Sequence, residues 1–251
     1  MPLEDGYQLN RLGSRPELRW PQRWLEAGLA ILFPLRCAGC GQTKAIWCPE
    51  CNRTMRKLRG RLCSQCGFPL RSRSFCLTCS RHPTPLKVRS YAIYEGPLAR
   101  ALLQLKYSSN RLLAFTMSQW LVELLSQETW QVDLVVPVPL GRDRLRQRGY
   151  NQAGLIANAL AESQHLQYSD RALQRIRETR SQVGLDAMAR MRNVQGAFLA
   201  DSAIVEGKRV IVVDDLYTTG ATLSSCAQAL LEAGAVEVYG LTVGRAHGYI
   251  Q

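Results

Sequence analysis

The hydrophobic pattern of the chain changes near residue 87. From there to the C-terminus, short apolar runs alternate with longer segments in which apolar residues recur every three or four positions. The short runs predict strands at 88–94, 132–136, 209–213 and 236–243. The longer segments predict helices at 98–105, 111–127, 151–162 and 221–233. Apolar strands that alternate with helices are typical of a parallel sheet flanked by helices, so we expect an α/β fold here.

The first 86 residues lack this alternation. Residues 1–22 are polar, and we expect a loosely ordered N-terminus there. Residues 23–33 carry apolar residues at helical spacing and stop before a proline, which predicts a short amphipathic helix. The expected organisation is therefore a flexible N-terminus (1–22), a helix with a cysteine-rich module (23–86) and the α/β domain (87–251).

Eight of the nine cysteines form pairs of the type Cys-x-x-Cys. Such a turn presents two thiolates to one tetrahedral ion, and a second turn completes a four-cysteine zinc site. Joining the pairs in chain order gives two zinc ribbons, whereas joining the first with the third and the second with the fourth is the alternative. Gly41 and Gly67 directly follow two pairs, where such turns need a positive φ or a close backbone approach. We expect two structural zinc ions, held by Cys37, Cys40, Cys48 and Cys51, and by Cys63, Cys66, Cys76 and Cys79.

A disulfide framework in an exported protein is the competing interpretation of these cysteines. The chain begins MPLEDGYQLN, which is not the basic-then-apolar pattern of an export signal. Its most apolar early stretch, residues 28–35, is far shorter than the ~20 residues of a membrane span. We therefore favour zinc, a cytoplasmic location and no membrane span. Cys226 lies in an apolar helical pattern, so we expect it to be buried, and His82 is a less favoured zinc ligand.

Nearly all of the net positive charge lies in the first third of the chain. The net charge is +12, and residues 1–90 contain 16 basic and 5 acidic side chains. Eight thiolates and two Zn²⁺ ions would reduce the +11 of this part to about +7. Such a module suits a nucleic-acid backbone or an acidic partner protein. Between Asn52 and Ser90 there is no acid, and the basic residues are Arg53, Arg56, Lys57, Arg59, Arg61, Arg71, Arg73, Arg81, Lys87 and Arg89.

The segment 209–223 carries the strongest functional signal. Its apolar strand is followed by Asp214 and Asp215, at the strand end where open α/β sheets bind ligands. The next loop, residues 217–222, offers backbone N–H groups, threonine hydroxyls and a helix N-terminus, which suit a phosphate. Adjacent carboxylates accept hydrogen bonds from a vicinal diol, so the segment fits a ribose 5-phosphate. The chain has neither a P-loop nor a GxGxxG sequence, which argues against those nucleotide sites.

At these residues the chain resembles the type I phosphoribosyltransferases. The resemblance implies that Asp214 and Asp215 hold the 2′- and 3′-hydroxyls of phosphoribosyl pyrophosphate (PRPP). It also implies phosphoribosyl transfer, a glycosyltransferase reaction, with Mg²⁺ bound alongside PRPP and an acceptor that no motif identifies. The residues that would bind the 5-phosphate are Thr218, Thr219, Gly220, Ala221 and Thr222.

Further motifs narrow the resemblance to the ComF family, over about residues 24–245. They include Leu-Phe-Pro-Leu-Arg-Cys at 32–37, the cysteine pairs, Leu-Lys-Tyr at 105–107, Arg-Gly-Tyr-Asn-Gln at 148–152 and Arg-Met-Arg-Asn-Val at 190–194. That family joins a double zinc ribbon to a type I phosphoribosyltransferase-like domain. Its members include competence proteins of bacterial DNA uptake and relatives linked to the use of DNA as a nutrient. The resemblance implies PRPP or a related ribose phosphate as ligand, and single-stranded DNA and uptake proteins as partners.

Two arginine-rich segments are candidates for binding pyrophosphate. Residues 141–149 follow a strand end, and we expect a loop there. Residues 171–200 form a long polar connection, which corresponds to a flexible hood over PRPP in the resembled fold. The alternatives are solvated basic loops and, for Lys106, a solvated lysine. The candidates are Lys106, Arg142, Arg144, Arg146, Arg148, Arg175, Arg177, Arg190 and Arg192.

Two functions from different classes follow from these patterns. The first is a phosphoribosyltransferase in which arginines stabilise the leaving pyrophosphate while the anomeric carbon gains positive charge. The second is a non-catalytic protein whose basic ribbon binds single-stranded DNA or acts as an adaptor, with the phosphoribosyltransferase fold kept as a scaffold. Aromatic residues near the ribbon are few (Trp47, Phe68 and Phe75), which favours electrostatic binding over base stacking.

Overall fold

The computed structural model describes residues 35–43, 45–81, 83–177 and 195–246. The expected helix at 23–33, His82, Arg190 and Arg192 lie outside these residues. The chain divides into two units, residues 1–35 and 36–251. The second unit holds both the cysteine-rich module and the α/β domain.

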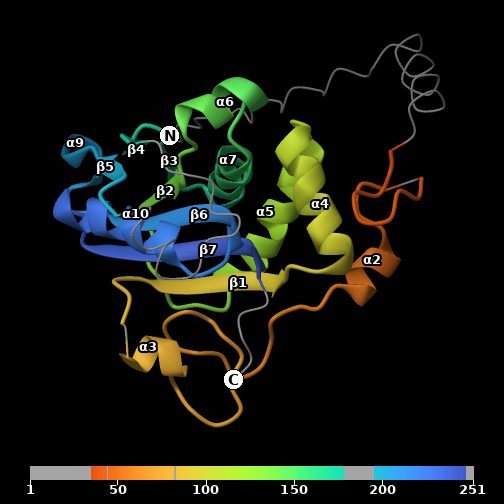
Figure 1. Ribbon diagram of the computed structural model, residues 1–251, viewed down its shortest axis with the longest axis horizontal. Coiled ribbons are helices and arrows are strands. Elements are labelled where there is room, and N and C mark those ends of the chain that lie inside the picture. The colour runs from red at the N-terminus through yellow and green to blue at the C-terminus, as the bar shows by residue number, and fades with distance from the viewer. Residues whose placement is uncertain (1–34, 44, 82, 178–194, 247–251) are drawn as a thin grey trace, which may run out of the picture. The chain divides into compact units, whose positions relative to one another are not determined.

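A five-stranded sheet forms the centre of the α/β domain, and all its neighbouring strands are parallel (Figure 1). Alternate residues of one strand face opposite cores, with Val210 and Val212 on one side and Ile211 and Val213 on the other. The expected parallel sheet, buried on both faces, is therefore confirmed. In spatial order the strands are β1 (Lys87–Ile93), β7 (Glu237–Arg245), β6 (Arg209–Tyr217), β2 (Leu134–Pro137) and β3 (Gln167–Tyr168).

Helices cover both faces of this sheet. Among the longer helices of the described residues, three pack on the face that includes Ile211 and one packs on the opposite face, where Cys226 is fully buried as expected. The buried cysteines of the first group form a small cluster of their own with Trp47, which also packs against the three-helix core. Three cysteines of the second group belong to the core on the α10 side. The three helices are α4 (Gly96–Tyr107), α5 (Arg111–Leu125) and α7 (Gln152–Gln164), and the single helix is α10 (Ala221–Glu232).

Strand β6 is longer than its apolar run. We expected it to end at Val213, because two acids interrupt the hydrophobic pattern there. The backbone pairing with β7 instead continues, so that Asp214 is opposite Thr242 and Tyr217 is opposite Arg245. This is a correction: Asp214 and Asp215 lie within the strand rather than after it.

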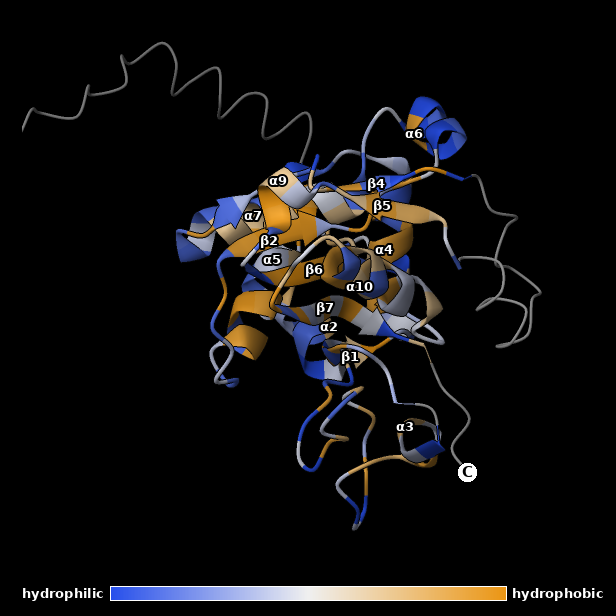
Figure 2. Cartoon of the chain, turned by 90° about the vertical axis from the view of Figure 1, so that its left-hand side faces the viewer, coloured by the Kyte–Doolittle hydropathy of each residue, from blue (hydrophilic) through white to orange (hydrophobic). Residues whose placement is uncertain are grey.

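The expected loop at 141–149 is also wrong, since most of it forms helix α6 (Arg142–Arg148). Gly149 adopts a left-handed conformation with φ 75° and its N–H donates to the carbonyl of Leu145, which is a common way to end a helix. The helix has an acid in its first turn and arginines in its last, as the helix dipole favours. It buries no residue and is hydrophilic in Figure 2, so it has no apolar face that a periodicity analysis detects.

Several short elements were not predicted, because two to six residues are too few for a periodic pattern. The described ends of the long connection 171–200 form an antiparallel pair, which packs against the α10 side of the sheet. No helix in the described parts of the chain is long and apolar enough to cross a membrane. The short elements are α2 (Pro49–Thr54), α3 (Leu77–Arg81), β4 (Leu173–Arg175), β5 (Phe198–Ala200) and α9 (Ser202–Val205), besides β3.

Candidate functional site

The two candidate acids occupy adjacent positions of β6, and their side chains leave the strand on opposite sides. Asp215 is buried, and its Oδ2 lies 2.9 Å from Nζ of Lys106 near the end of α4. Asp214 is half-buried, and its Oδ1 accepts a hydrogen bond from the backbone N–H of Asp215 at 2.8 Å. Lys106 is therefore not a solvated lysine, since its side chain is only 22% exposed and pairs with an acid of the motif.

The surroundings of this pair disfavour two negative charges. Burial, followed by the charge of Asp215, raises the pKa of Asp214 well above its usual value. Burial opposes the charge on Lys106, but the charge of Asp215 and its hydrogen bond outweigh that effect and raise the lysine pKa. Lys106 is therefore protonated at neutral pH, and Asp214 keeps its proton to a higher pH than an exposed aspartate does. A ligand that brings hydroxyl donors to Asp214 would stabilise its charged form.

The candidate phosphate loop connects β6 to α10. Gly220 has φ 82°, a left-handed conformation that glycine adopts readily, and it directly precedes the helix. No side chain caps the N-terminus of α10, and the N–H of Ala221 makes only a 3.4 Å contact with Oγ1 of Thr219. The backbone N–H groups of the first turn of α10 are thus suited to an anion. Thr218, Thr219 and Thr222 are all half-buried around this turn.

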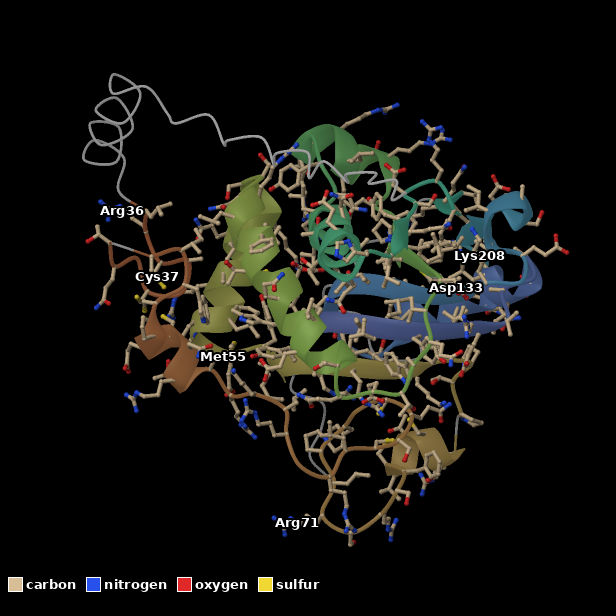
Figure 3. The ribbon with its side chains drawn as sticks, turned by 180° about the vertical axis from the view of Figure 1, so that it is seen from behind. Arg36, Cys37, Met55, Arg71, Asp133 and Lys208 are labelled. Carbon is tan, nitrogen blue, oxygen red and sulfur yellow. The ribbon has the colours of Figure 1, made fainter. Side chains whose placement is uncertain are left out.

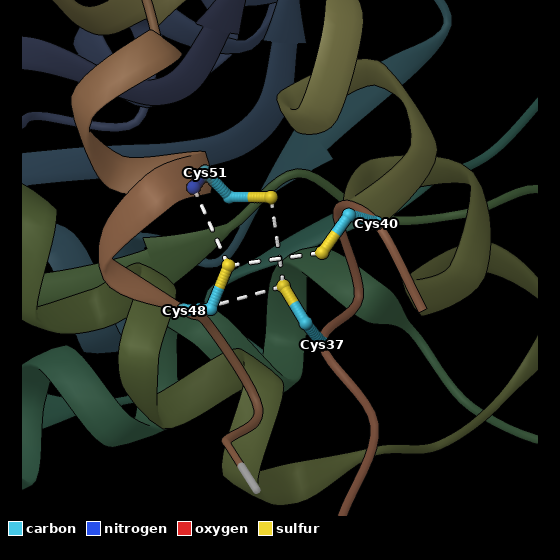
Figure 4. Close-up of side chains that lie close together, drawn as sticks. All are labelled: Cys37, Cys40, Cys48 and Cys51. Atoms are coloured by element: carbon cyan, nitrogen blue, oxygen red, sulfur yellow. Dashed lines mark hydrogen bonds between the residues drawn. The ribbon is translucent and has the colours of Figure 1, made fainter. Parts of the chain in front are cut away.

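The eight paired cysteines form two separate clusters in chain order, so the alternative cross-braced pairing is wrong. Within each cluster all four sulfur atoms lie within 4.8 Å of one another. In the first cluster the sulfurs of Cys37 and Cys51 are 3.6 Å apart, and those of Cys40 and Cys48 are 3.7 Å apart (Figure 4). Sulfurs at the corners of a tetrahedron with ~2.3 Å Zn–S bonds stand about 3.8 Å apart. Both clusters therefore fit a structural zinc ion.

Backbone N–H groups point at these sulfurs, as expected for thiolate ligands. In the first cluster the N–H of Cys48 donates to Sγ of Cys37 at 3.3 Å, and in the second the N–H of Cys76 donates to Sγ of Cys63 at 3.4 Å. Burial opposes ionisation, but such donors outweigh it and lower the pKa of Cys37 to about 6 and that of Cys63 to about 7. All eight cysteines are free thiols rather than disulfides, and Gly41 and Gly67 have the positive φ that was predicted.

The candidate arginines are distributed over several elements. Arg148 donates to Oε1 of Gln152 at 2.9 Å and stacks on Tyr107, beside a hollow that Arg111 also lines. Arg146 forms an exposed ion pair with Asp143 within α6. In the long connection 171–200, the Arg175 guanidinium stacks on Phe198, and Arg177 donates to the carbonyl of Gln195. Among the described candidates, Lys106 contacts the motif directly through its ion pair with Asp215. Arg142 and Arg144 lie on α6, and contact of any arginine with pyrophosphate stays a prediction.

Much of the basic charge that the sequence assigns to the ribbons is paired with acids. Six ion pairs account for six of the ten basic residues between Asn52 and Ser90: Arg53–Glu50, Arg56–Glu95, Lys57–Glu123, Arg59–Glu123, Lys87–Glu237 and Arg89–Glu128. Within the described residues, Arg61, Arg71, Arg73 and Arg81 have no acidic partner, and all four belong to the second ribbon. Arg71 lies at the outer end of this ribbon (Figure 3).

Sequence reasoning missed one buried charge. Arg245 is only 6% exposed and stands at the end of β7, where it contacts both Cys66 and the ring of Tyr217. The only signal in the sequence is an arginine directly after an apolar strand. Among the aromatic residues near the ribbon, Trp47 packs on Trp120 and Phe68 lies under Arg245, whereas Phe75 is 46% exposed.

Comparisons with known proteins agree with this arrangement. Residues 28–80 match the family model of the double zinc ribbon domain, and residues 145–245 match that of the phosphoribosyl transferase domain. A solved glutamine PRPP amidotransferase from B. subtilis, complexed with ADP and GMP, aligns with a TM-score of 0.38 and 25% identity, over 56% of this chain and 30% of that chain. The two family matches define a phosphoribosyltransferase-type domain preceded by a double zinc ribbon.

Two curated proteins are similar to this chain along most of their length. The DNA utilization protein YhgH of Escherichia coli (strain K12) is 36% identical over 198 residues, which cover 76% of this chain and 86% of that protein. The competence protein ComFC of Bacillus subtilis (strain 168) is 26% identical over 198 residues, which cover 74% and 78% of the two chains. The chain belongs to the ComF family.

Proposed function

We propose that this protein binds PRPP together with Mg²⁺ through Asp214, Asp215 and residues 218–222, and that it takes part in the uptake or use of DNA. The observation that carries the proposal is the Lys106–Asp215 ion pair beside Asp214, on the strand whose following loop leads into the uncapped helix α10. This arrangement supports a ligand with hydroxyl donors at one end and a phosphate at the other.

The acids and the loop have separate roles in the proposed site. Asp214 and Asp215 accept hydrogen bonds from the ribose diol, and these donors stabilise the charged form of Asp214, which burial and the charge of Asp215 oppose in the free protein. The first turn of α10 and the hydroxyls of Thr218, Thr219 and Thr222 bind the 5-phosphate. The loop joins the end of β6 to the start of α10. The distance between the groups that bind the diol and those that bind the phosphate is therefore set by this short connection.

The cations around the site are suited to the pyrophosphate group. Lys106 is already protonated and held next to Asp215, so it can interact with a leaving phosphate without a change in its charge. Arg148 and the other arginines of α6 follow β2, whose last residue pairs with Val213 of β6. Mg²⁺ bound to the diol and pyrophosphate oxygens would neutralise part of the charge on the leaving group. In the proposed phosphoribosyl transfer, the bond from the anomeric carbon to pyrophosphate breaks and a bond to the acceptor forms.

The proposed link to DNA rests on the relatives. Their names assign them to DNA utilization and to competence, and they are similar to this chain over about three quarters of its length. We propose the same biological setting for this protein.

Thermal unfolding tests the ligand. A ligand that binds only the folded state raises Tm, so PRPP with Mg²⁺ should raise the Tm of the wild-type protein. The shift should be lost in the Asp214→Asn/Asp215→Asn variant, which cannot accept the diol in the same way. Glu232→Gln is the control, because Glu232 is an exposed acid at the C-terminal end of α10, away from the proposed site, and it should keep the shift. An equal shift in the double variant and the wild type would contradict the assignment.

A second candidate function, the binding of single-stranded DNA, is favoured by one specific observation. Arg61, Arg71, Arg73 and Arg81 lack acidic partners among the described residues, and Phe75 is exposed on the same ribbon. Cations that are not neutralised within the protein can bind phosphates, and an exposed aromatic ring can stack on a base. In this function the phosphoribosyltransferase fold serves as a scaffold.

Fluorescence anisotropy with an oligo-dT probe tests this second function. Arg71→Ala/Arg73→Ala should weaken binding and reduce the slope of log affinity against log salt by about two. Arg53→Ala/Arg56→Ala is the matched control, because it removes the same charge from residues that pair with Glu50 and Glu95. If the two double variants bind DNA alike, the unpaired arginines do not form the DNA site.

A further inference from the structure

Arg245 connects the second zinc site to the strand that carries the candidate phosphate loop. It is buried at the end of β7, and its Nη1 donates to the carbonyl of Cys66 at 2.6 Å. Its Nη2 lies 3.6 Å from Sγ of the same cysteine. Its guanidinium also lies 4.3 Å from the ring centre of Tyr217 and 5.4 Å from that of Phe68. One side chain therefore contacts both a zinc ligand and the last residue of β6.

Tyr217 extends these contacts to the phosphate loop. Its ring is buried and packs so closely on Gly220 that a Cβ added there would lie 2.8 Å from Cζ of Tyr217. Gly220 has φ 82° and directly precedes Ala221, the first residue of α10. The position of the tyrosine ring therefore limits how the turn can move, and with it the N–H groups that face the proposed 5-phosphate.

The charge of the second zinc site suits a buried arginine. Burying a cation is unfavourable unless opposite charge and hydrogen bonds surround it. Four thiolates around one Zn²⁺ carry a net charge of about −2, and the metal also fixes the position of Cys66. Among the residues that the structure describes, Arg245 has no carboxylate partner, so the zinc site is its source of negative charge. Two aromatic rings supply the remaining contacts.

We propose that Arg245 is a positioning residue through which the zinc ion of the second site holds residues 217–222 in the shape that binds a ribose 5-phosphate. This inference rests on the proposed function, because it concerns affinity for that ligand. The first zinc site has different contacts with the α/β domain. There Arg100, near the start of α4, donates from Nε to the carbonyl of Gly39, and Trp47 packs on Trp120.

Two arginine-to-lysine variants form a matched comparison. Arg245→Lys keeps the positive charge but loses the planar group that binds Cys66 and stacks on Tyr217. Arg100→Lys makes the same change at an arginine that contacts the first ribbon. We expect Arg245→Lys to lower the affinity for PRPP about tenfold, within the usual range of coupling between sites, and Arg100→Lys to leave it unchanged. Both variants should retain about two zinc ions.

Amide hydrogen exchange without any ligand provides a local readout. In Arg245→Lys, residues 217–222 should exchange about tenfold faster, while residues 210–213 of the same strand keep wild-type protection. A merely structural role would increase exchange in both segments alike, and that result would overturn the proposal. Because no ligand is present, a wild-type protein that fails to bind PRPP contradicts the proposed function but leaves this comparison intact.

The role of the metal is tested at a ligand that is less buried than its neighbours. Cys76→Ser should reduce the zinc content from about two ions to one and should increase exchange in residues 217–222, as Arg245→Lys does. Wild-type protection of the loop in the one-zinc protein would overturn the link to the metal.

A second pair of variants covers the case in which Arg245→Lys does not fold. Tyr217→Leu removes the ring that contacts Arg245 and Gly220 without changing any cysteine, and it should expose the loop to exchange. Tyr217→Phe keeps the ring and should keep the protection. Equal protection of the loop in Tyr217→Leu and the wild type overturns the proposal.

Discussion

Lys106 and Asp215 form an ion pair of 2.9 Å that joins the end of α4 to the middle of the candidate site. Their side chains are 22% and 8% exposed, so the pair is largely shielded from water. The two residues are far apart in the sequence and come from different elements, which α4 and β6 bring together across one face of the sheet. The lysine balances the charge of an acid that the proposed function assigns to the ribose.

Loss of this lysine should destabilise the protein. Lys106→Met leaves the carboxylate of Asp215 buried without a cation, and we expect a loss of about 1–3 kcal/mol in the free energy of unfolding, somewhat less than for a fully buried pair. Urea unfolding measures this change. Lys87→Met is the control, because Lys87 pairs with Glu237 at an exposed site and should change stability by less than about 1 kcal/mol. If both variants lose the same free energy of unfolding, the shielding of the Lys106–Asp215 pair from water does not contribute to stability.

The raised pKa of Asp214 predicts a specific pH dependence. A carboxyl group whose pKa is higher in the folded state binds more protons there than in the unfolded chain, whose aspartates titrate near ~3.9. Stability should therefore fall as the pH rises through the folded-state pKa, because ionisation of Asp214 is opposed by burial and by Asp215. Asp214→Asn removes this contribution. In urea unfolding, the stability of the variant relative to the wild type should thus increase as the pH rises above ~3.9, whereas a constant difference contradicts the assigned pKa direction.

Gly220 should be much less tolerant of substitution than another glycine with the same backbone conformation. Gly220→Ala adds a Cβ that meets the ring of Tyr217, in addition to the strain of a positive φ, and should cost about 2–4 kcal/mol. Gly207 has φ 71°, and a Cβ added there would meet no atom within 4 Å. Gly207→Ala should therefore lower the free energy of unfolding by the backbone strain alone, about 1–2 kcal/mol. Urea unfolding compares the two, and equal losses would show that the contact with Tyr217 is not tight.

Metal analysis tests the two cysteine clusters. The purified protein should contain about two zinc ions per chain, since each cluster offers four sulfurs at tetrahedral spacing. Cys40→Ser should lower the content to about one ion, because it removes a ligand from the first cluster only. The thiolates of Cys37 and Cys63, with pKa values of about 6 and 7, should favour retention of zinc at neutral pH and its release in acid. Paired disulfides without zinc would contradict both sites.

The metal sites and the main sheet were predictable because their signals are local in the sequence. Cysteines at a spacing of three identify a zinc turn by themselves, and an apolar run such as Val210–Val213 indicates a buried strand. The two acids and the glycine of the loop also lie within one short segment. Spacing alone did not decide which cysteine pairs share a zinc site, and the structure shows that consecutive pairs do.

The remaining features depend on contacts between distant segments. Nothing near Lys106 in the sequence indicates that it pairs with Asp215, and nothing near Lys57 or Arg59 indicates that Glu123 of α5 neutralises them. Helix α6 was missed because it buries no residue, and β6 was predicted too short because its pairing with β7 continues through the acids. Such features follow from the tertiary fold rather than from local pattern.

Isothermal titration of the protein with PRPP in the presence of Mg²⁺ tests the central claim most directly. Asp214, Asp215 and the loop before α10 are assigned to one ribose phosphate, so the wild-type protein should bind PRPP at one site per chain. The Asp214→Asn/Asp215→Asn variant should show no binding heat, and Glu232→Gln, at the far end of α10, should bind as the wild type does. Absence of binding heat in the wild type, or equal binding by the double variant, would contradict the account.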